Sequence, residues 1–166
     1  GIASRGLGDV YKRQGAGNKG GDGSTPGGGG GGGGGEGTGP DDEREGGIGG
    51  SGQVKISWER TRTFNGSGSW TVPAGITSID IEIWGAGGGG AGSNNTLIDG
   101  QPGGGGGAYT KSSLLVTPGT TYSVHVGSGG TGGTGTGGTE DGTDGGDSWF
   151  SLRGDCTAPT SKAEGS

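Results

Sequence analysis

The chain has 166 residues, of which 53 are glycine and only 22% are hydrophobic, and its formal net charge is −6. So little apolar surface is typical of disordered chains, but only six prolines and the unbroken glycine run over 27–35 exclude a collagen strand. No window approaches 18 apolar residues, which excludes a membrane-spanning helix, and a single cysteine excludes an intrachain disulfide or a cysteine-based zinc site.

Residues 1–14 differ from the rest of the chain. The segment 9–14 reads back to GATGTGTATAAGAGACAG, which resembles the transposase mosaic end of sequencing-library adapters, and the chain contains no methionine. We therefore expect residues 1–14 to be an adapter artefact and the chain to be a fragment; the alternative is a disordered basic arm. Residues 1–14 carry a net charge of +2, which leaves −8 for the remainder. Such an acidic chain is a poor candidate for binding nucleic acid or an anionic membrane.

The first strand signal follows a low-complexity stretch over 15–52. Val54, Ile56 and Trp58 alternate with polar residues, which predicts a half-buried strand. The polar residues 59–62 predict a linker.

Further alternation of apolar and polar residues occurs over 69–72, 79–84 and 121–126, with turn signals at 73–75 and 117–119. The side chains expected to face a core are Trp70, Val72, Ile79, Ile81, Ile83, Tyr122, Val124 and Val126. No stretch shows helical periodicity. The pattern therefore predicts an all-β fold with glycine-rich insertions.

The glycine runs allow two interpretations. They are flexible linkers, or they are polyglycine II helices, which have three residues per turn and no internal hydrogen bonds. Several such helices can pack side by side and bond to one another, because no Cβ keeps their backbones apart. The run over 27–35 would then span about 28 Å.

Four spaced blocks resemble one known family. They are residues 64–90, which contain Ser-Trp-Thr-Val-Pro and Trp-Gly-Ala-Gly-Gly-Gly-Gly, and residues 103–109, 116–130 and 145–150. Their order is similar to that of the glycine-rich domains of phage tail-fibre and adhesin proteins. The resemblance implies antiparallel, sandwich-like strands with glycine-rich insertions that pack as polyglycine II helices, and a partly disordered chain.

The resemblance also implies a domain organisation. The family's closing strand has the form Gly-x-Val-x-Ile-x-Trp, which residues 52–58 fit although they precede the opening block. We therefore expect a piece of a tandem array. In this interpretation 15–58 is the C-terminal part of one repeat, 59–62 is a linker, and 63–166 is the N-terminal part of a second, truncated domain.

A receptor-binding loop is implied between two glycine tracts. In adhesins of this type, loops that join the glycine helices contact the host receptor, and the segments 93–101 and 41–45 occupy such positions. The alternative is a length-variable loop without a partner. The residues expected to bind are Asn94, Asn95, Leu97, Ile98, Asp99 and Gln101.

No catalytic, metal or cofactor site is expected. His125 is the single histidine, and a dyad with Cys156 is less favoured than a solvated histidine on the polar face of a strand. The carboxylates over 140–147 suggest calcium ligands, but they lack the glutamate that ends an EF-hand loop. A solvated, flexible turn is favoured there.

The function expected is therefore structural and adhesive rather than enzymatic. The resemblance implies a phage tail or tail-fibre protein that binds a host surface receptor, protein or glycan, or neighbouring virion proteins, with a homo-oligomer possible in the full-length form. One alternative is the glycine-rich ectodomain of a cellular surface or secreted protein. Another is the non-catalytic part of a virion-associated hydrolase. The expected location is the virion or the cell exterior.

Overall fold

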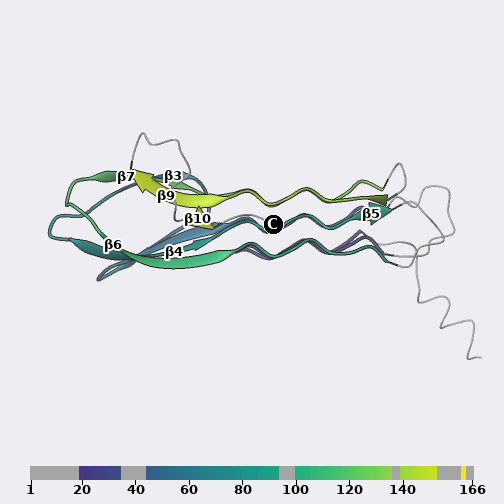
Figure 1. Ribbon diagram of the computed structural model, residues 1–166, viewed down its shortest axis with the longest axis horizontal. Helices are drawn as coiled ribbons and strands as arrows, with labels where there is room; N and C mark the ends of the chain where they lie inside the picture. Colours follow the sequence, from purple (N-terminus) through teal and green to yellow (C-terminus); the bar gives the residue numbers. More distant parts are fainter. Residues whose placement is uncertain (1–18, 35–43, 94–99, 136–138, 153–161, 164–166) are drawn as a thin grey trace, which may run out of the picture.

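The computed structural model describes residues 19–34, 44–93, 100–135, 139–152 and 162–163. These residues form an elongated molecule, with two sheets at one end and extended glycine-rich segments running from them to the other end (Figure 1). The described residues form strands and no helix, which confirms the all-β prediction.

Two four-stranded antiparallel sheets make up a sandwich. The order in the first sheet is β2 (Thr61–Phe64), β1 (Gln53–Ser57), β4 (Ser78–Trp84), β6 (Tyr109–Leu115). The order in the second sheet is β10 (Lys162–Ala163), β9 (Ser148–Leu152), β7 (Thr121–His125), β3 (Gly68–Thr71). A short antiparallel pair, β5 (Gly92–Ser93) with β8 (Thr139–Glu140), lies at the far end of the glycine-rich segments (Figure 1).

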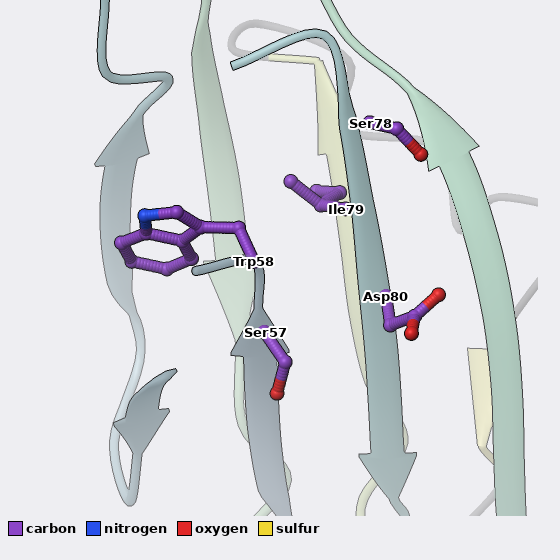
Figure 2. Close-up of a pocket in the computed structure, with 5 residues that line it drawn as sticks. All are labelled: Ser57, Trp58, Ser78, Ile79 and Asp80. Atoms are coloured by element: carbon purple, nitrogen blue, oxygen red, sulfur yellow. The ribbon is translucent and has the colours of Figure 1, made fainter. Parts of the chain in front are cut away.

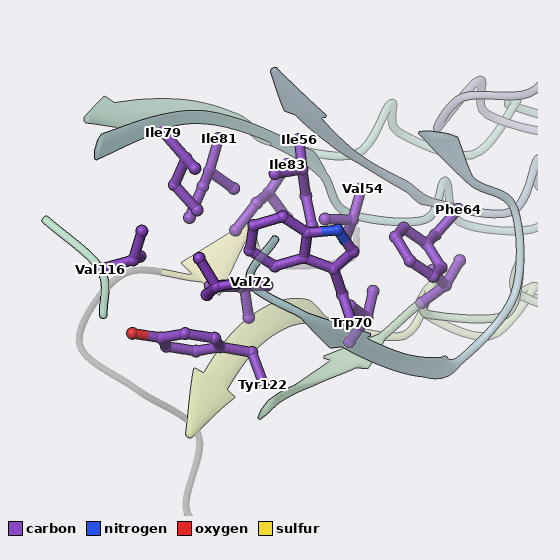
Figure 3. Close-up of a cluster of buried hydrophobic side chains, with 13 residues drawn as sticks. Val54, Ile56, Phe64, Trp70, Val72, Ile79, Ile81, Ile83, Val116 and Tyr122 are labelled. Atoms are coloured by element: carbon purple, nitrogen blue, oxygen red, sulfur yellow. The ribbon is translucent and has the colours of Figure 1, made fainter. Parts of the chain in front are cut away.

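The core lies between the two sheets (Figure 3). Its centre is Trp70, whose ring centroid lies 5.4 Å from that of Trp58, 6.5 Å from Tyr122 and 6.3 Å from Phe150. All eight side chains expected to face a core are buried, because alternate residues of a strand point to the same face. Trp58 is only partly buried against this cluster.

The segment 59–62, predicted to be a linker, is a bend that continues into β2. Thr61 pairs with Ser57, and Arg62 pairs with Ile56. Three of the four residues of β2 are exposed and only Phe64 is buried. The strand was missed because an edge strand with polar side chains on both faces has no hydrophobic alternation.

Strand β1 belongs to the same sheet as the strands that follow it in sequence. Its ladder with β4 runs from Gln53–Trp84 to Ser57–Asp80. Residues on both sides of the expected repeat boundary therefore share one sheet here. The assignment of residues 15–58 and 63–166 to two repeats of an array stays a prediction.

The sheets continue into what we call the glycine lattice, seven extended segments that lie side by side. The segments are 19–24, 27–34, 44–52, 85–93, 100–108, 126–135 and 139–147. The central segment, 85–93, follows directly from β4 and is buried throughout. It exchanges main-chain hydrogen bonds with five of the other six segments, some antiparallel to it and some parallel.

The hydrogen bonds of the central segment repeat every three residues. Successive N–H groups donate in rotation to segments 100–108, 139–147 and 44–52. One such series is Gly88 to Gly105 (2.9 Å), Gly89 to Thr143 (3.0 Å) and Gly90 to Gly47 (2.9 Å). Three residues per turn without bonds inside the segment is the pattern of polyglycine II. Of the two interpretations of the glycine runs, the packed one holds for the described tracts.

Glycine is required in the lattice because a Cβ has no room there. A Cβ built on Gly49 would lie 1.9 Å from the carbonyl oxygen of Gly87, and one on Gly90 would lie 2.1 Å from that of Gly31. Backbone conformation is not the reason. Of the described lattice glycines, only Gly27 and Gly135 have positive φ, so the others adopt angles that any residue tolerates.

The acidic segment 140–147, expected to be a flexible turn, is instead part of the lattice. The N–H of Thr143 donates to the carbonyl of Thr131 (2.9 Å), and that of Gly146 donates to Ser128 (2.8 Å). A threefold segment also separates residues three apart, such as Asp141 and Asp144, by about 9 Å. The prediction of a flexible turn was wrong because the neighbouring glycine tracts fix this backbone.

Candidate functional site

Described residues from several lattice segments lie together at the end of the lattice farthest from the sandwich. The carbonyl of Arg44 accepts a hydrogen bond from the N–H of Ser93 (3.0 Å), and that of Gly33 accepts one from Gln101 (3.0 Å). Ser93 also pairs with Thr139. The described residues that flank segments 35–43, 94–99 and 136–138 are therefore gathered at one end. Arg44 is buried there, with 1% of its surface exposed.

The predicted receptor-binding residues lie mainly outside the described part of the chain. These are Asn94, Asn95, Leu97, Ile98 and Asp99. Gln101 is described, and it belongs to the lattice because its N–H bonds to Gly33 (3.0 Å) and its carbonyl oxygen lies 1.7 Å from the position of a Cβ on Gly32. A binding role for these six residues stays a prediction.

The outer face of the first sheet carries a connected polar and aromatic cluster. The ammonium of Lys55 donates to Glu82 Oε1 (2.9 Å), and the Tyr109 hydroxyl donates to Glu82 Oε2 (3.0 Å). The Tyr109 ring lies 5.0 Å from that of Trp84, centroid to centroid. The ladders place these side chains on three neighbouring strands, β1, β4 and β6. The Glu82 carboxylate thus accepts one hydrogen bond from each of the two strands that flank β4.

These contacts shift three pKa values. The hydrogen bond from Lys55, followed by that from Tyr109, lowers the pKa of Glu82. The same hydrogen bond to Glu82 raises the pKa of Lys55. Partial removal from water, together with the bond to Glu82, raises the pKa of Tyr109. All three shifts keep the cluster in its bonded state at neutral pH.

The outer face of the second sheet carries His125. Its ring stacks on Trp149 with centroids 3.7 Å apart, and its Nδ1 lies 3.4 Å from Ser67 Oγ. The half-buried histidine does lie on the polar face of its strand, as expected, but it is only partly solvated because its ring stacks on Trp149. Trp149 lies directly opposite His125 in the β7–β9 ladder, and this pairing follows from the register of two strands that are distant in sequence. Cys156 lies outside the described residues.

Sequence reasoning missed the Lys55–Glu82–Tyr109 cluster. Each member occupies an outward position of a strand, which the alternation already indicated for Lys55 and Glu82. Their meeting depends on the register, however, and 27 residues separate each partner from Glu82. The available signal was that each strand carries an outward charged or aromatic residue, with Lys55 at the middle of β1, Glu82 in the second half of β4 and Tyr109 at the start of β6.

The described residues contain no group of three or more histidine, cysteine, aspartate or glutamate side chains that could hold a metal ion. They also contain no helix long and apolar enough to cross a membrane.

An all-β sandwich whose strands extend into a threefold glycine lattice defines a glycine-rich structural class. A family model described as a glycine-rich domain matches residues 62–166, which is more than half of the chain. The chain belongs to this glycine-rich domain family. No curated protein and no solved structure matches it.

Proposed function

We propose that this chain is a non-enzymatic, adhesive domain of a phage tail or tail-fibre protein, located in the virion. It binds a host surface receptor, a protein or a glycan, through loops held on a rigid scaffold. The observation that supports this function most is that the flanks of three segments converge at the far end of the lattice. Arg44, Ser93 and Thr139 lie together there.

The lattice suits this role because it limits motion at the loop bases. Every N–H from Gly85 to Ala91 donates a hydrogen bond to a neighbouring segment. Loops anchored on such a scaffold lose less conformational entropy on binding than loops with free ends. The receptor contacts can then vary in sequence without any change in the glycine positions.

Adsorption to intact cells tests the proposal. The full chain, fluorescently labelled, is incubated with a panel of bacterial and eukaryotic cells, and bound fluorescence is measured. We expect adsorption to some bacterial surfaces, and its loss when Asn94–Asp99 is replaced by glycine and serine with thermal unfolding unchanged. The control changes exposed side chains at the opposite end, Glu59→Ser with Arg60→Ser, and should adsorb normally.

Two outcomes contradict the proposal. Adsorption that survives replacement of all three loop segments would remove the loops from the function. Adsorption to eukaryotic cells alone would favour an ectodomain of a cellular surface protein.

A further inference from the structure

A small depression lies at the end of the sandwich that is farther from the lattice, where β1 ends and β4 begins (Figure 2). Its volume is about 160 Å³, and it is lined by Ser57, Trp58, Ser78, Ile79 and Asp80. It exists because β1 ends at Ser57 and the chain bends away, with the N–H of Trp58 donating to the carbonyl of Arg60 (2.7 Å). Strand β4 extends two residues beyond that point.

The two sides of the depression differ in chemistry. On one side is the half-buried indole of Trp58, whose ring is held 5.4 Å from that of Trp70 in the core. On the other side are Ser57 and Asp80, which face each other in the β1–β4 ladder. The Ser113 hydroxyl on β6 donates to Asp80 Oδ1 (2.5 Å), and Oδ2 can accept a further hydrogen bond.

Main-chain groups complete the rim. The carbonyl of Thr77 accepts a hydrogen bond from Val116, so the main chain of Thr77 points toward the β6 side. Successive residues of an antiparallel strand point their N–H and C=O groups to opposite sides. The main-chain groups of Ser78 therefore point to the β1 side, where the described ladder has already ended at Ser57–Asp80.

We propose that this depression binds one neutral sugar unit of a glycan. A sugar ring offers an apolar face to the indole and hydroxyl donors to Asp80, while the serine hydroxyls and the main chain of Ser78 both donate and accept. The volume of the depression agrees with a single sugar ring. Pockets for drug-sized ligands measure about 300–1,000 Å³, and this depression, at about 160 Å³, is suited to a smaller ligand. An acidic sugar is disfavoured by Asp80 and by the net charge of −6. A quaternary ammonium group is recognised by several aromatic walls, and only one is present here.

This site is separate from the loops of the proposed function, and the two succeed or fail independently. The test is a titration of the ¹⁵N-labelled full chain with glucose, galactose, mannose and N-acetylglucosamine, alone and as short neutral oligosaccharides. The four tryptophan indole N–H signals are followed, and Trp58 is assigned with Trp58→Phe. We expect a saturable shift of the Trp58 signal alone, with Trp84 and Trp149 as internal controls on the outer sheet faces.

Substitution of Asp80 provides the second half of the test. Asp80→Asn keeps the shape of the carboxylate and removes its charge, and it should weaken sugar binding about tenfold. The matched control, Asp144→Asn on the exposed side of the lattice, should bind as the unchanged chain does. Replacement of Asn94–Asp99 should also leave the sugar shift intact.

Three results would overturn the proposal. The first is a Trp58 signal that no neutral saccharide moves. The second is equal affinity in Asp80→Asn and Asp144→Asn. The third is a Trp58 shift produced by tetramethylammonium or a lysine peptide instead of a sugar, which would assign the depression to a cationic partner.

Discussion

The sandwich and the glycine lattice are stabilised by opposite means although the same strands run through both (Figure 1). In β4, the buried side chains Ile79, Ile81 and Ile83 recur every two residues and fill the space between the sheets. From Gly85 onward the hydrogen bonds recur every three residues, and the segments approach so closely that no side chain fits between them. The transition takes place at Trp84–Gly85, without a break in the chain.

This difference determines which substitutions each region tolerates. The sandwich depends on the volume of its side chains, so that removal of atoms leaves a cavity. The lattice depends on the absence of side chains, so that addition of one methyl group forces backbones apart. Substitutions that remove side-chain volume should therefore destabilise the sandwich, and substitutions that add it should destabilise the lattice.

The largest effect is expected from Trp70→Ala. Trp70 is 5% exposed and its ring lies close to three other aromatic rings. Its truncation should lower the free energy of unfolding by about 3–5 kcal/mol, measured by urea denaturation. Because that loss is enough to unfold a small domain, Ile56→Val serves as the graded companion, with an expected loss of about 1 kcal/mol. A neutral Ile56→Val would show that the sandwich core is not closely packed.

The next effect is expected from Gly90→Ala in the lattice. The added Cβ would lie 2.1 Å from the carbonyl oxygen of Gly31, a main-chain atom that no rotamer change can move away. We expect a loss of about 3 kcal/mol, at the upper end for overpacking. The control is Gly21→Ala, where nothing lies within 4 Å of the new Cβ. Equal unfolding midpoints for the two variants would refute the close packing of the central segment.

Much of the sandwich could be predicted from the sequence because burial on one face produces a visible alternation. The sequence did not distinguish a packed lattice from a flexible linker, because glycine has no side chain and a glycine tract therefore shows no alternation of buried and exposed residue types. One signal was available nonetheless. Over 127–135, the residues that are not glycine are Ser128, Thr131 and Thr134, which are spaced by three and all exposed. Such spacing indicates threefold segments whose outward positions alone accept a side chain.

The candidate sites were less predictable for a different reason. The Lys55–Glu82–Tyr109 cluster and the depression at Trp58 and Asp80 both depend on the register of β1 with β4. Register is determined by long-range packing and not by local pattern. The sequence therefore indicated outward residues without indicating which of them meet.

Hydrogen exchange can compare the two interpretations of the glycine tracts residue by residue. All seven amides from Gly85 to Ala91 donate hydrogen bonds, and in the outer segment Gly104 and Gly107 donate to Gly30 and Gly27 (both 2.7 Å). Gly103 is exposed and lies between Gln101 and Gly104, whose N–H groups both donate hydrogen bonds. We expect continuous protection in the central segment and faster exchange at Gly103 than at Gly104 and Gly107. Uniform immediate exchange would restore the linker interpretation.

The smallest effect is expected from Glu82→Gln on the sandwich surface, where neither volume nor backbone spacing is involved. Glu82 has a pKa below its ordinary value of 4.5, so its contribution to stability is present above pH 4.5 and is lost as the pH falls through the lowered value. Lys55 and Tyr109 have raised pKa values, and their contributions are present below their ordinary values of 10.5 and 10.0 and are lost at higher pH.

The difference in Tm between the unchanged chain and Glu82→Gln should therefore be flat from about pH 6 to pH 9 and close at both extremes. Its size should not exceed about 4 °C, because the pair lies on the sheet surface with side chains that are only partly buried, and water screens their attraction. Calorimetry across this pH range measures it, with Asp144→Asn as the exposed control. A gap that persists below pH 3 would mean that Glu82 acts through packing and not through its charge. The sandwich surface would then follow the same volume rule as its core.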